Sequence, residues 1–276
     1  MRKILSVVLV LAGLGAGSGL FAQLNEAERA GYDAWEEFLR TAKVTDQRQM
    51  ERIEGVTTPW VLTLEKDGVV RRGLWKDALG ERVGGFKETW KGEIAAYRLS
   101  RHLGLHMVPP TVEREFRGSR GSCQLWFEAW VTMAEVRGQK LKPPGPRVAQ
   151  FFRGLYLQRA FDNLVSNEDR HLRNYLIMDD WRMILIDHSR SFRTTKKFRT
   201  GLIYDEKSKE GANFIMAELP RAFVEALKTL THESVRAVVG EYLTDEEIDA
   251  ALARRDLILA WLDKRVAALG EAKVLY

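Results

Sequence analysis

Residues 161–174 read FDNLVSNEDRHLRN, and residues 186–189 read IDHS. Between these two stretches, YLIM at 175–178 and RMILI at 182–186 flank Asp179-Asp180, a pattern that predicts a short β-hairpin. The polar side chains therefore fall on loops that apolar elements hold in place. Loops of this kind commonly carry the function of a protein.

The spacing of three polar residues matches the needs of phosphoryl transfer. A kinase needs one carboxylate at the acceptor hydroxyl, and an amide and a second carboxylate on the metal that grips the nucleotide phosphates. Its catalytic loop places the Asn five residues after the Asp, and the metal-binding Asp follows a short hairpin. Here Asn174 lies five residues after Asp169, and Asp187 lies thirteen residues after Asn174. Mg²⁺ prefers hard oxygen ligands of this kind.

Five stretches together resemble a known group of enzymes. NEDRHLRN at 167–174, followed by IDHS, is similar to the catalytic and metal-binding loops of atypical kinases of the phosphatidylinositol 3-/4-kinase-like superfamily, including HipA-type kinases and secreted relatives. GLWK at 73–76 resembles their nucleotide-gripping strand. WKGEIAAYRL at 90–99, followed by LGLHMVPP at 103–110, resembles their small-lobe helix and the strand after it. The resemblance spans roughly residues 55–262.

The resemblance implies a nucleotide site in the first half of the chain. Lys76 would contact the α- and β-phosphates of ATP, and Glu93 would hold Lys76 in place. Lys87 and Lys91 compete with Lys76 for this role, because most lysines are simply exposed. The glycine-rich phosphate cover of ordinary kinases is reduced here to GVTTP at 55–59.

The resemblance also implies roles for the second half. Asp169 would accept or orient the acceptor hydroxyl, and His171 would stabilise charge on the transferred phosphate. Asn174 and Asp187 would bind Mg²⁺ or Mn²⁺, which both accept oxygen ligands. His188-Ser189 stands where ordinary protein kinases have Phe-Gly. The expected reaction is transfer of the γ-phosphoryl group of ATP to an unidentified hydroxyl on a protein, lipid or small molecule.

Simpler interpretations of the same residues remain open. Asp187 directly follows an apolar run, where an unpaired carboxylate is costly, but it could also start a turn or cap a helix. Asn174 could be a turn residue. Asp169 could form a structural ion pair with Arg170 or Arg173.

Two other functions compete with a kinase. Asp169, His171, Asp187 and His188 have the ligand types of a metal-dependent phosphohydrolase. A kinase-like module that binds a nucleotide or a partner without catalysis is the other alternative. A basic run after Asp187 predicts either a solvated loop or a contact for an anionic substrate. Its members are Arg190, Arg193, Lys196, Lys197 and Arg199.

The order of predicted elements gives the fold class. A helix at 25–42, strands at 60–64 and 69–75, a helix at 91–103 and extended runs from 108 and over 122–133 precede the Pro-rich stretch KLKPPGPR at 140–147. Helices are expected beyond it, at 148–165, 220–230, 233–242 and 245–269. This is an α+β order. We expect a bilobal protein-kinase-like fold, with a strand-rich N-lobe at 23–133 and a larger, mostly helical C-lobe at 134–276.

Composition excludes several classes of protein. The 276 residues carry 43 basic and 38 acidic side chains, a net charge of +5. No Lys/Arg run is long enough to follow a phosphate backbone, so a nucleic-acid partner is not expected. The single cysteine, Cys123, rules out an intrachain disulfide and a Cys-rich zinc site, and it is expected in the core.

The first 22 residues predict a targeting segment. Arg2-Lys3 precede an apolar run at 4–16, and Leu20-Phe-Ala22 offers a cleavage site before Gln23. The apolar run is short for a spanning helix, which needs about 20 residues. We expect export to the periplasm or the outside, with an uncleaved membrane anchor as the alternative. Because ATP is scarce outside the cytoplasm, another phosphodonor, an inward-facing anchored domain or loss of catalysis would each reconcile the two predictions.

Overall fold

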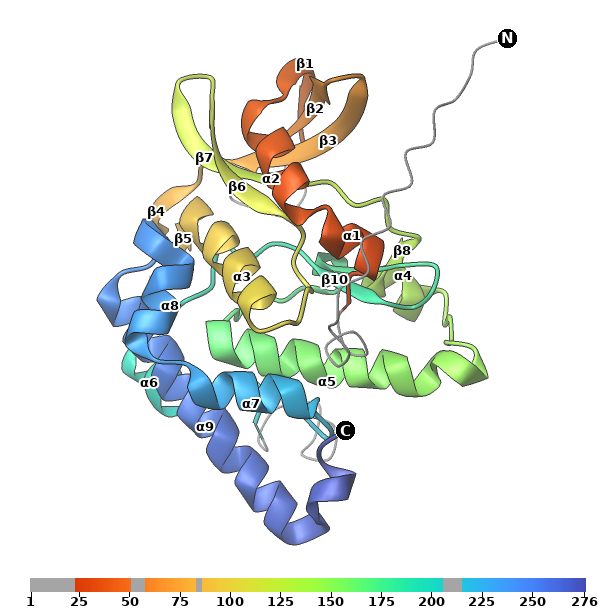
Figure 1. Cartoon of the computed structure of the whole chain (residues 1–276), viewed down its shortest axis with the longest axis vertical. Coiled ribbons are helices and arrows are strands. Elements are labelled where there is room, and N and C mark those ends of the chain that lie inside the picture. Colours follow the sequence, from red (N-terminus) through yellow and green to blue (C-terminus); the bar gives the residue numbers. More distant parts are fainter. Residues whose placement is uncertain (1–22, 51–57, 83–85, 206–214) are drawn as a thin grey trace.

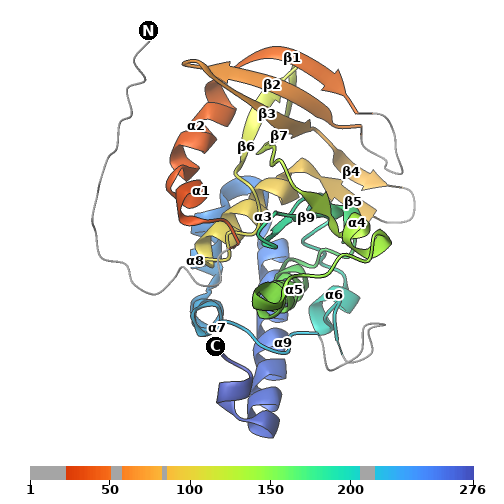
Figure 2. The ribbon, with the colours of Figure 1, turned by 90° about the vertical axis from the view of Figure 1, so that its right-hand side faces the viewer.

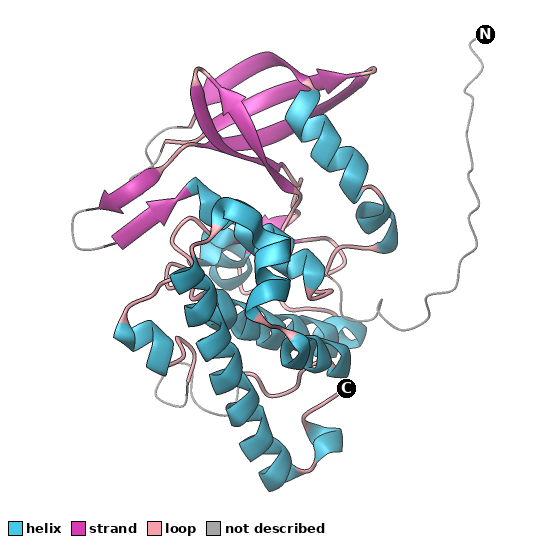
Figure 3. Ribbon diagram, turned by 60° about the vertical axis from the view of Figure 1, so that its left-hand side comes forward, coloured by secondary structure: helices cyan, strands magenta, loops and turns pink. Residues whose placement is uncertain are grey.

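The computed structural model describes residues 23–50, 58–82, 86–205 and 215–276. The predicted targeting segment at 1–22 and most of the predicted phosphate cover at 55–59 lie outside the described residues. The chain forms two lobes, one rich in strands and one mostly helical (Figure 1, Figure 3). The predicted α+β bilobal fold is confirmed.

The smaller lobe is built on a five-stranded antiparallel sheet in the order β1-β2-β3-β7-β6. Its strands are β1 (Lys43–Gln49), β2 (Trp60–Lys66), β3 (Val69–Lys76), β6 (Thr111–Phe116) and β7 (Ser119–Leu125). A separate pair, β4 (Leu79–Arg82) and β5 (Phe86–Thr89), follows β3. Helices α1 (Glu26–Ala30), α2 (Tyr32–Thr41) and α3 (Trp90–His102) complete the lobe.

The β2–β3 hairpin forms where the sequence predicted it. Asp67 and Gly68 both have positive φ angles, 52° and 77°. A two-residue loop of this kind matches the right-handed twist of the flanking strands, which is why Asp-Gly is favoured there. The register pairs Trp60 with Trp75, so the end of β3 that carries Lys76 is fixed by the turn.

The predicted single helix at 25–42 is wrong, because the structure has two helices separated at Gly31. Asn25 and Glu28 form a reciprocal capping box that starts α1. A Cβ atom at position 31 would lie 2.9 Å from the Trp35 indole nitrogen. Glycine therefore lets the chain turn tightly while Trp35 packs back over the break.

The larger lobe consists of helices around a small sheet in the order β10-β9-β8. The sheet strands are β8 (Val131–Thr132), β9 (Tyr175–Ile177) and β10 (Met183–Leu185). The helices are α4 (Met133–Gly138), α5 (Val148–Val165), α6 (Lys196–Thr200), α7 (Arg221–Thr229), α8 (His232–Val239) and α9 (Asp245–Leu269), with 3₁₀ turns η1 (Gly145–Arg147), η2 (Leu172–Asn174), η4 (Gly240–Tyr242) and η5 (Glu271–Lys273). Figure 2 shows the five-stranded sheet at the top of the molecule and α9 at the bottom.

The chain passes between the lobes after β7. Leu125 ends β7 in the five-stranded sheet, and Val131 begins β8, which pairs with β9 of the helical lobe. The extended run expected over 122–133 is therefore two short strands in different sheets. The division of the chain at 133 and 134 stays a prediction, and the strand pairing supports a crossing a few residues earlier.

A second connection comes from α3, which packs against α8 of the helical lobe. Within α3, Gly92 lies directly on the loop that follows β10, and a Cβ atom there would come within 2.8 Å of the His188 carbonyl oxygen. The missing side chain therefore sets how closely α3 approaches the loop that contains Asp187. Among the described residues, no helix is long and apolar enough to span a membrane.

Replacing Gly92 by Ala tests this close approach. Alanine favours a helix over glycine by up to about 1 kcal/mol, but here the methyl group would overlap backbone, which typically costs about 1–3 kcal/mol. We expect Gly92→Ala to lower the free energy of unfolding in urea. Gly138→Ala in α4, where a Cβ atom meets open space, should be neutral or stabilising. A Gly92→Ala protein as stable as wild type would contradict the close approach.

Candidate active site

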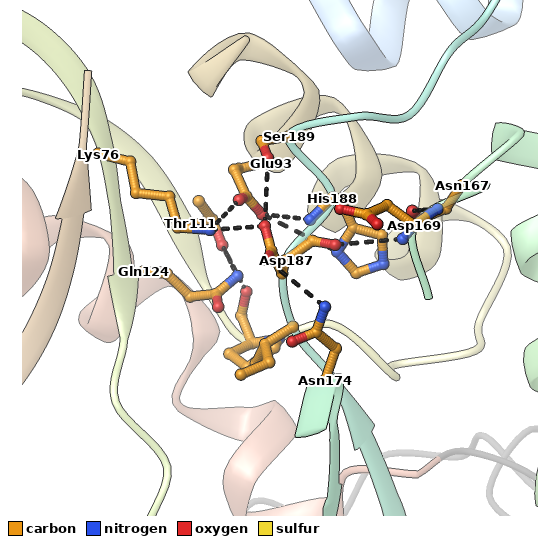
Figure 4. A network of polar contacts seen from close by, with 12 residues as sticks. Lys76, Glu93, Thr111, Gln124, Asn167, Asp169, Asn174, Asp187, His188 and Ser189 are labelled. Carbon is orange, nitrogen blue, oxygen red and sulfur yellow. Dashed lines mark hydrogen bonds and ion pairs between the residues drawn. The ribbon is translucent and has the colours of Figure 1, made fainter. Parts of the chain in front are cut away.

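The centre of the site is the ammonium group of Lys76 at the end of β3 (Figure 4). Its Nζ atom lies 2.6 Å from Glu93 Oε1 and 2.8 Å from Asp187 Oδ1. The three residues come from β3, from α3 and from the loop after β10. Lys76 and Glu93 are buried, whereas the Asp187 side chain is 38% exposed.

The charges of this triad determine one another. Burial disfavours the charged form of Lys76, but Asp187 and Glu93 outweigh it and hold the pKa of the ammonium above its ordinary value. Burial also disfavours the charged form of Asp187, which would raise the pKa of its carboxyl. The Lys76 ammonium opposes this effect and holds the pKa of Asp187 well below the ordinary range. Both groups are therefore charged at neutral pH.

Asp187 is held in an unusual backbone conformation. Its φ angle is 61°, a left-handed value that is uncommon for residues other than glycine. The Asn167 amide donates to the Asp187 carbonyl oxygen over 3.1 Å. The Oδ1 atom of Asn167 in turn accepts from the Asp169 backbone N–H over 3.2 Å. One side chain thus fixes the loops of both aspartates relative to each other.

Asn174 lies at the end of η2, beside Asp187. Its Nδ2 atom is 3.4 Å from Asp187 Oδ2. A half-turn of the terminal amide exchanges its NH₂ group and its oxygen, so Asn174 can offer an oxygen ligand next to the carboxylate. This donor set of one amide and one carboxylate suits Mg²⁺ or Mn²⁺ with water and phosphate completing the shell. The structure therefore fits the metal that the sequence predicted.

Asp169 contacts two side chains, His171 and Arg190. His171 Nε2 lies 2.7 Å from Asp169 Oδ1, and Arg190 Nη1 lies 3.0 Å from Oδ2. Of the two alternative ion pairs expected for Asp169, with Arg170 or with Arg173, the one with Arg170 does not form. Arg170 instead pairs with buried Asp162 through two contacts of 2.9 Å.

The contact with Arg170 also determines the protonation and the tautomer of His188. Its Nη2 atom lies 2.8 Å from His188 Nε2, and a guanidinium can only donate. Burial, then the nearby Arg170 charge, holds the pKa of His188 well below its ordinary value, so the ring is neutral with its proton on Nδ1. The Nε2 lone pair is therefore used, and His188 offers no free nitrogen to a metal. In the described part of the chain, no group of three or more His, Cys, Asp or Glu side chains could hold a metal ion. The use of the His188 nitrogen by Arg170 weighs against the metal-dependent phosphohydrolase.

Sequence reasoning did not single out Glu88. This buried residue of β5 lies 3.4 Å from Ser189 Oγ, whose single hydroxyl hydrogen can be donated to Glu88 or to Asp187, 3.2 Å away. The Glu88 carboxylate is also 4.0 Å from Arg190 Nε. A lone acid in a short edge strand carries no sequence pattern, and only the fold brings it beside residues about a hundred positions away.

The fold is similar to those of solved kinases. Hydra Fam20, solved with a sugar, has a TM-score of 0.62 at 15% identity, covering 93% of this chain and 95% of that chain. The Golgi casein kinase has a TM-score of 0.61 at 15% identity, covering 90% of this chain and 79% of that chain. The same kinase with Mn and ADP bound has a TM-score of 0.60 at 16% identity with the same coverage.

These likenesses establish an atypical kinase-like fold for this chain. No protein-family model and no curated protein matches the sequence. The specific resemblance to phosphatidylinositol 3-/4-kinases and HipA-type kinases stays a prediction. The roles expected for Lys76, Glu93, Asp169, His171, Asn174 and Asp187 also stay predictions, although the structure brings all six to the same region (Figure 4 labels five of them).

A double-mutant cycle of Lys76→Met and Glu93→Gln measures the buried pair. Removing one member of a buried ion pair costs about 3–5 kcal/mol, because the other is left uncompensated. We expect each single change to destabilise the protein, and the pair to show a coupling energy of about 1–3 kcal/mol in urea unfolding. The exposed pair Lys66–Glu37, at 3.3 Å, should couple by less than about 1 kcal/mol in the matched cycle. Additive effects of Lys76 and Glu93 would show that they do not act together.

Proposed function

We propose that this protein is an ATP-dependent phosphotransferase that moves the γ-phosphoryl group of ATP to a hydroxyl. The observation that carries the proposal is the triad of Lys76, Glu93 and Asp187, with Asn174 and Asp169 on the adjoining loops. A kinase-like fold alone permits many functions, because function depends on the site rather than on the fold.

Each residue contributes a separate task. Lys76, kept charged by the two carboxylates, binds the α- and β-phosphates of ATP, and Glu93 fixes its position. Asn174 and Asp187 hold the metal, Mg²⁺ or Mn²⁺, which neutralises phosphate charge when bound. One solved neighbour of the same fold is a complex with Mn and ADP, which supports this pairing of ligands.

Asp169 acts on the acceptor. It orients the hydroxyl and takes its proton as the acceptor oxygen bonds to the γ-phosphorus, while the bond from that phosphorus to the bridging oxygen breaks and ADP leaves. His171, 2.7 Å from the same carboxylate, lies beside the developing charge. Catalysis of this kind comes mostly from positioning and charge neutralisation.

The place of action is also part of the proposal. The pattern at residues 2–22 supports export, and the Golgi casein kinase shows that a protein of this fold can belong to a secretory compartment. We propose that this chain acts after export, on an acceptor that its sequence does not identify.

Thermal unfolding tests the nucleotide site. ATP with Mg²⁺ or Mn²⁺ at about 100 times its dissociation constant should stabilise the folded form by roughly 2.7 kcal/mol. Asp187→Ala removes a metal ligand, so we expect the metal-dependent part of the shift to disappear. Asp179→Asn, an exposed acid in the β9–β10 turn, is the matched control and should keep the full shift. If no combination of nucleotide and metal stabilises the protein, the proposed nucleotide site is wrong and the function lies on another surface of the molecule.

Transfer of phosphate separates a kinase from a binding module. Because the acceptor is unidentified, hydrolysis of ATP in the presence of metal serves as the assay, with water in place of the hydroxyl. Asp169→Asn should reduce the rate by about 10²–10⁴-fold, the usual contribution of a positioned base, and should leave ADP affinity unchanged. Wild-type protein that binds ATP and metal but never cleaves ATP would favour the non-catalytic module.

A further inference from the structure

Arg190 joins the two halves of the candidate site. Its Nη1 atom lies 3.0 Å from Asp169 Oδ2 in the helical lobe, and its Nε atom lies 4.0 Å from Glu88 Oε1 in β5 of the smaller lobe. Glu88 is also 3.4 Å from Ser189 Oγ, whose other partner is Asp187. A chain of polar contacts therefore runs from Asp187 through Ser189, Glu88 and Arg190 to Asp169, and Arg190 is the cation that joins its two carboxylates Glu88 and Asp169.

The position of Arg190 differs from that of the other basic residues in its loop. Arg193 pairs with Glu168, Arg199 pairs with Glu246, and Lys197 lies over the Phe198 ring. Lys196 is exposed. Arg190, by contrast, contacts Asp169, one of the residues assigned to the reaction.

The acceptor side of the site needs a cation. A phosphoryl group that approaches the Asp169 carboxylate brings negative charge towards negative charge. Lys76 is assigned to the α- and β-phosphates of ATP, and the His171 side chain, at 70% exposure, is largely in solvent. The Arg190 side chain is only 21% exposed, and a guanidinium offers five N–H donors in a planar fork that matches phosphate oxygens.

Resting on the function proposed above, we infer that Arg190 is a catalytic residue that contacts the transferring phosphoryl group. Asp169 and Glu88 hold the guanidinium in position. When the acceptor oxygen bonds to the γ-phosphorus and the bond to the bridging oxygen of ADP breaks, Arg190 donates to the equatorial oxygens as their charge develops. The acceptor proton passes to the Asp169 carboxylate. The bond to this proton replaces the contact between Asp169 and Arg190.

Binding of a planar phosphate mimic tests this without knowledge of the acceptor. The affinity for ADP with metal reports contacts to the nucleotide outside the transferring phosphoryl group. The affinity for ADP with metal and aluminium fluoride also includes contacts to a planar mimic of that group. We expect Arg190→Gln to change the affinity for ADP and metal by less than about 3-fold and to weaken the aluminium fluoride complex by at least about 100-fold. A stabilising arginine in phosphoryl transfer contributes about 10³–10⁵ to kcat. ATP hydrolysis should fall in parallel.

Two further variants control the experiment. Arg190→Lys keeps the charge and loses the fork, so its loss should be smaller than that of Arg190→Gln, and it serves if Arg190→Gln fails to fold. Lys196→Gln removes one positive charge from the same loop and should bind the mimic as wild type does. If Arg190→Gln and Arg190→Lys both bind the mimic as tightly as wild type, Arg190 is only a structural partner of Asp169.

Failure of the proposed function has a different signature. Wild-type protein that binds ADP and metal but gains no affinity from aluminium fluoride would not be built for phosphoryl transfer, and the assignment of Arg190 would fall with it. Wild-type protein that does gain affinity, with an unaffected Arg190→Gln variant, would leave the kinase function standing and overturn the role of Arg190 alone.

Discussion

The ammonium of Lys76 between two carboxylates is the contact on which the arrangement of the site depends. It joins the end of β3, helix α3 and the loop after β10, three segments that are far apart in the sequence. Glu93 uses its second oxygen to accept from the His188 backbone N–H over 2.9 Å, so α3 grips the loop as well as the lysine. Buried ion pairs contribute little net stability compared with apolar packing. Their value here lies in fixing three charges at defined positions.

A second buried ion pair, Arg170 with Asp162, supports the same loops. Arg170 binds Asp162 and also donates to the Ile186 and Asn174 carbonyl oxygens, at 2.5 and 3.2 Å. These carbonyls lie beside the two residues assigned to the metal. Because Arg170 is committed to this structural role, the Asp169 carboxylate pairs with His171 and Arg190 instead.

The parts of this site that depend on local spacing could be predicted from the sequence. The interval from Asp169 to Asn174 and the hairpin before Asp187 are short-range features, and the Asp-Gly turn fixes the register that presents Lys76. Contacts between residues far apart in the sequence could not be predicted, because only the fold brings those residues together. Glu88 meets Ser189 across 101 positions, and Asp169 pairs with Arg190 rather than with the neighbouring Arg170 because buried Asp162 holds that guanidinium. The break at Gly31 was missed because the apolar spacing continues through it.

The backbone of Asp187 bears on whether the site is more than a scaffold. A left-handed conformation costs an L-residue roughly 1–2 kcal/mol, a cost that glycine would not have. The structure keeps Asp187 at a φ angle of 61° and adds the Asn167 side chain to hold its carbonyl. Strain of this kind persists where the surroundings over-determine it, and it clusters at active sites. In this conformation one carboxylate lies 2.8 Å from Lys76 Nζ and 3.4 Å from Asn174 Nδ2, so the backbone of the loop and the positions of the site charges depend on each other.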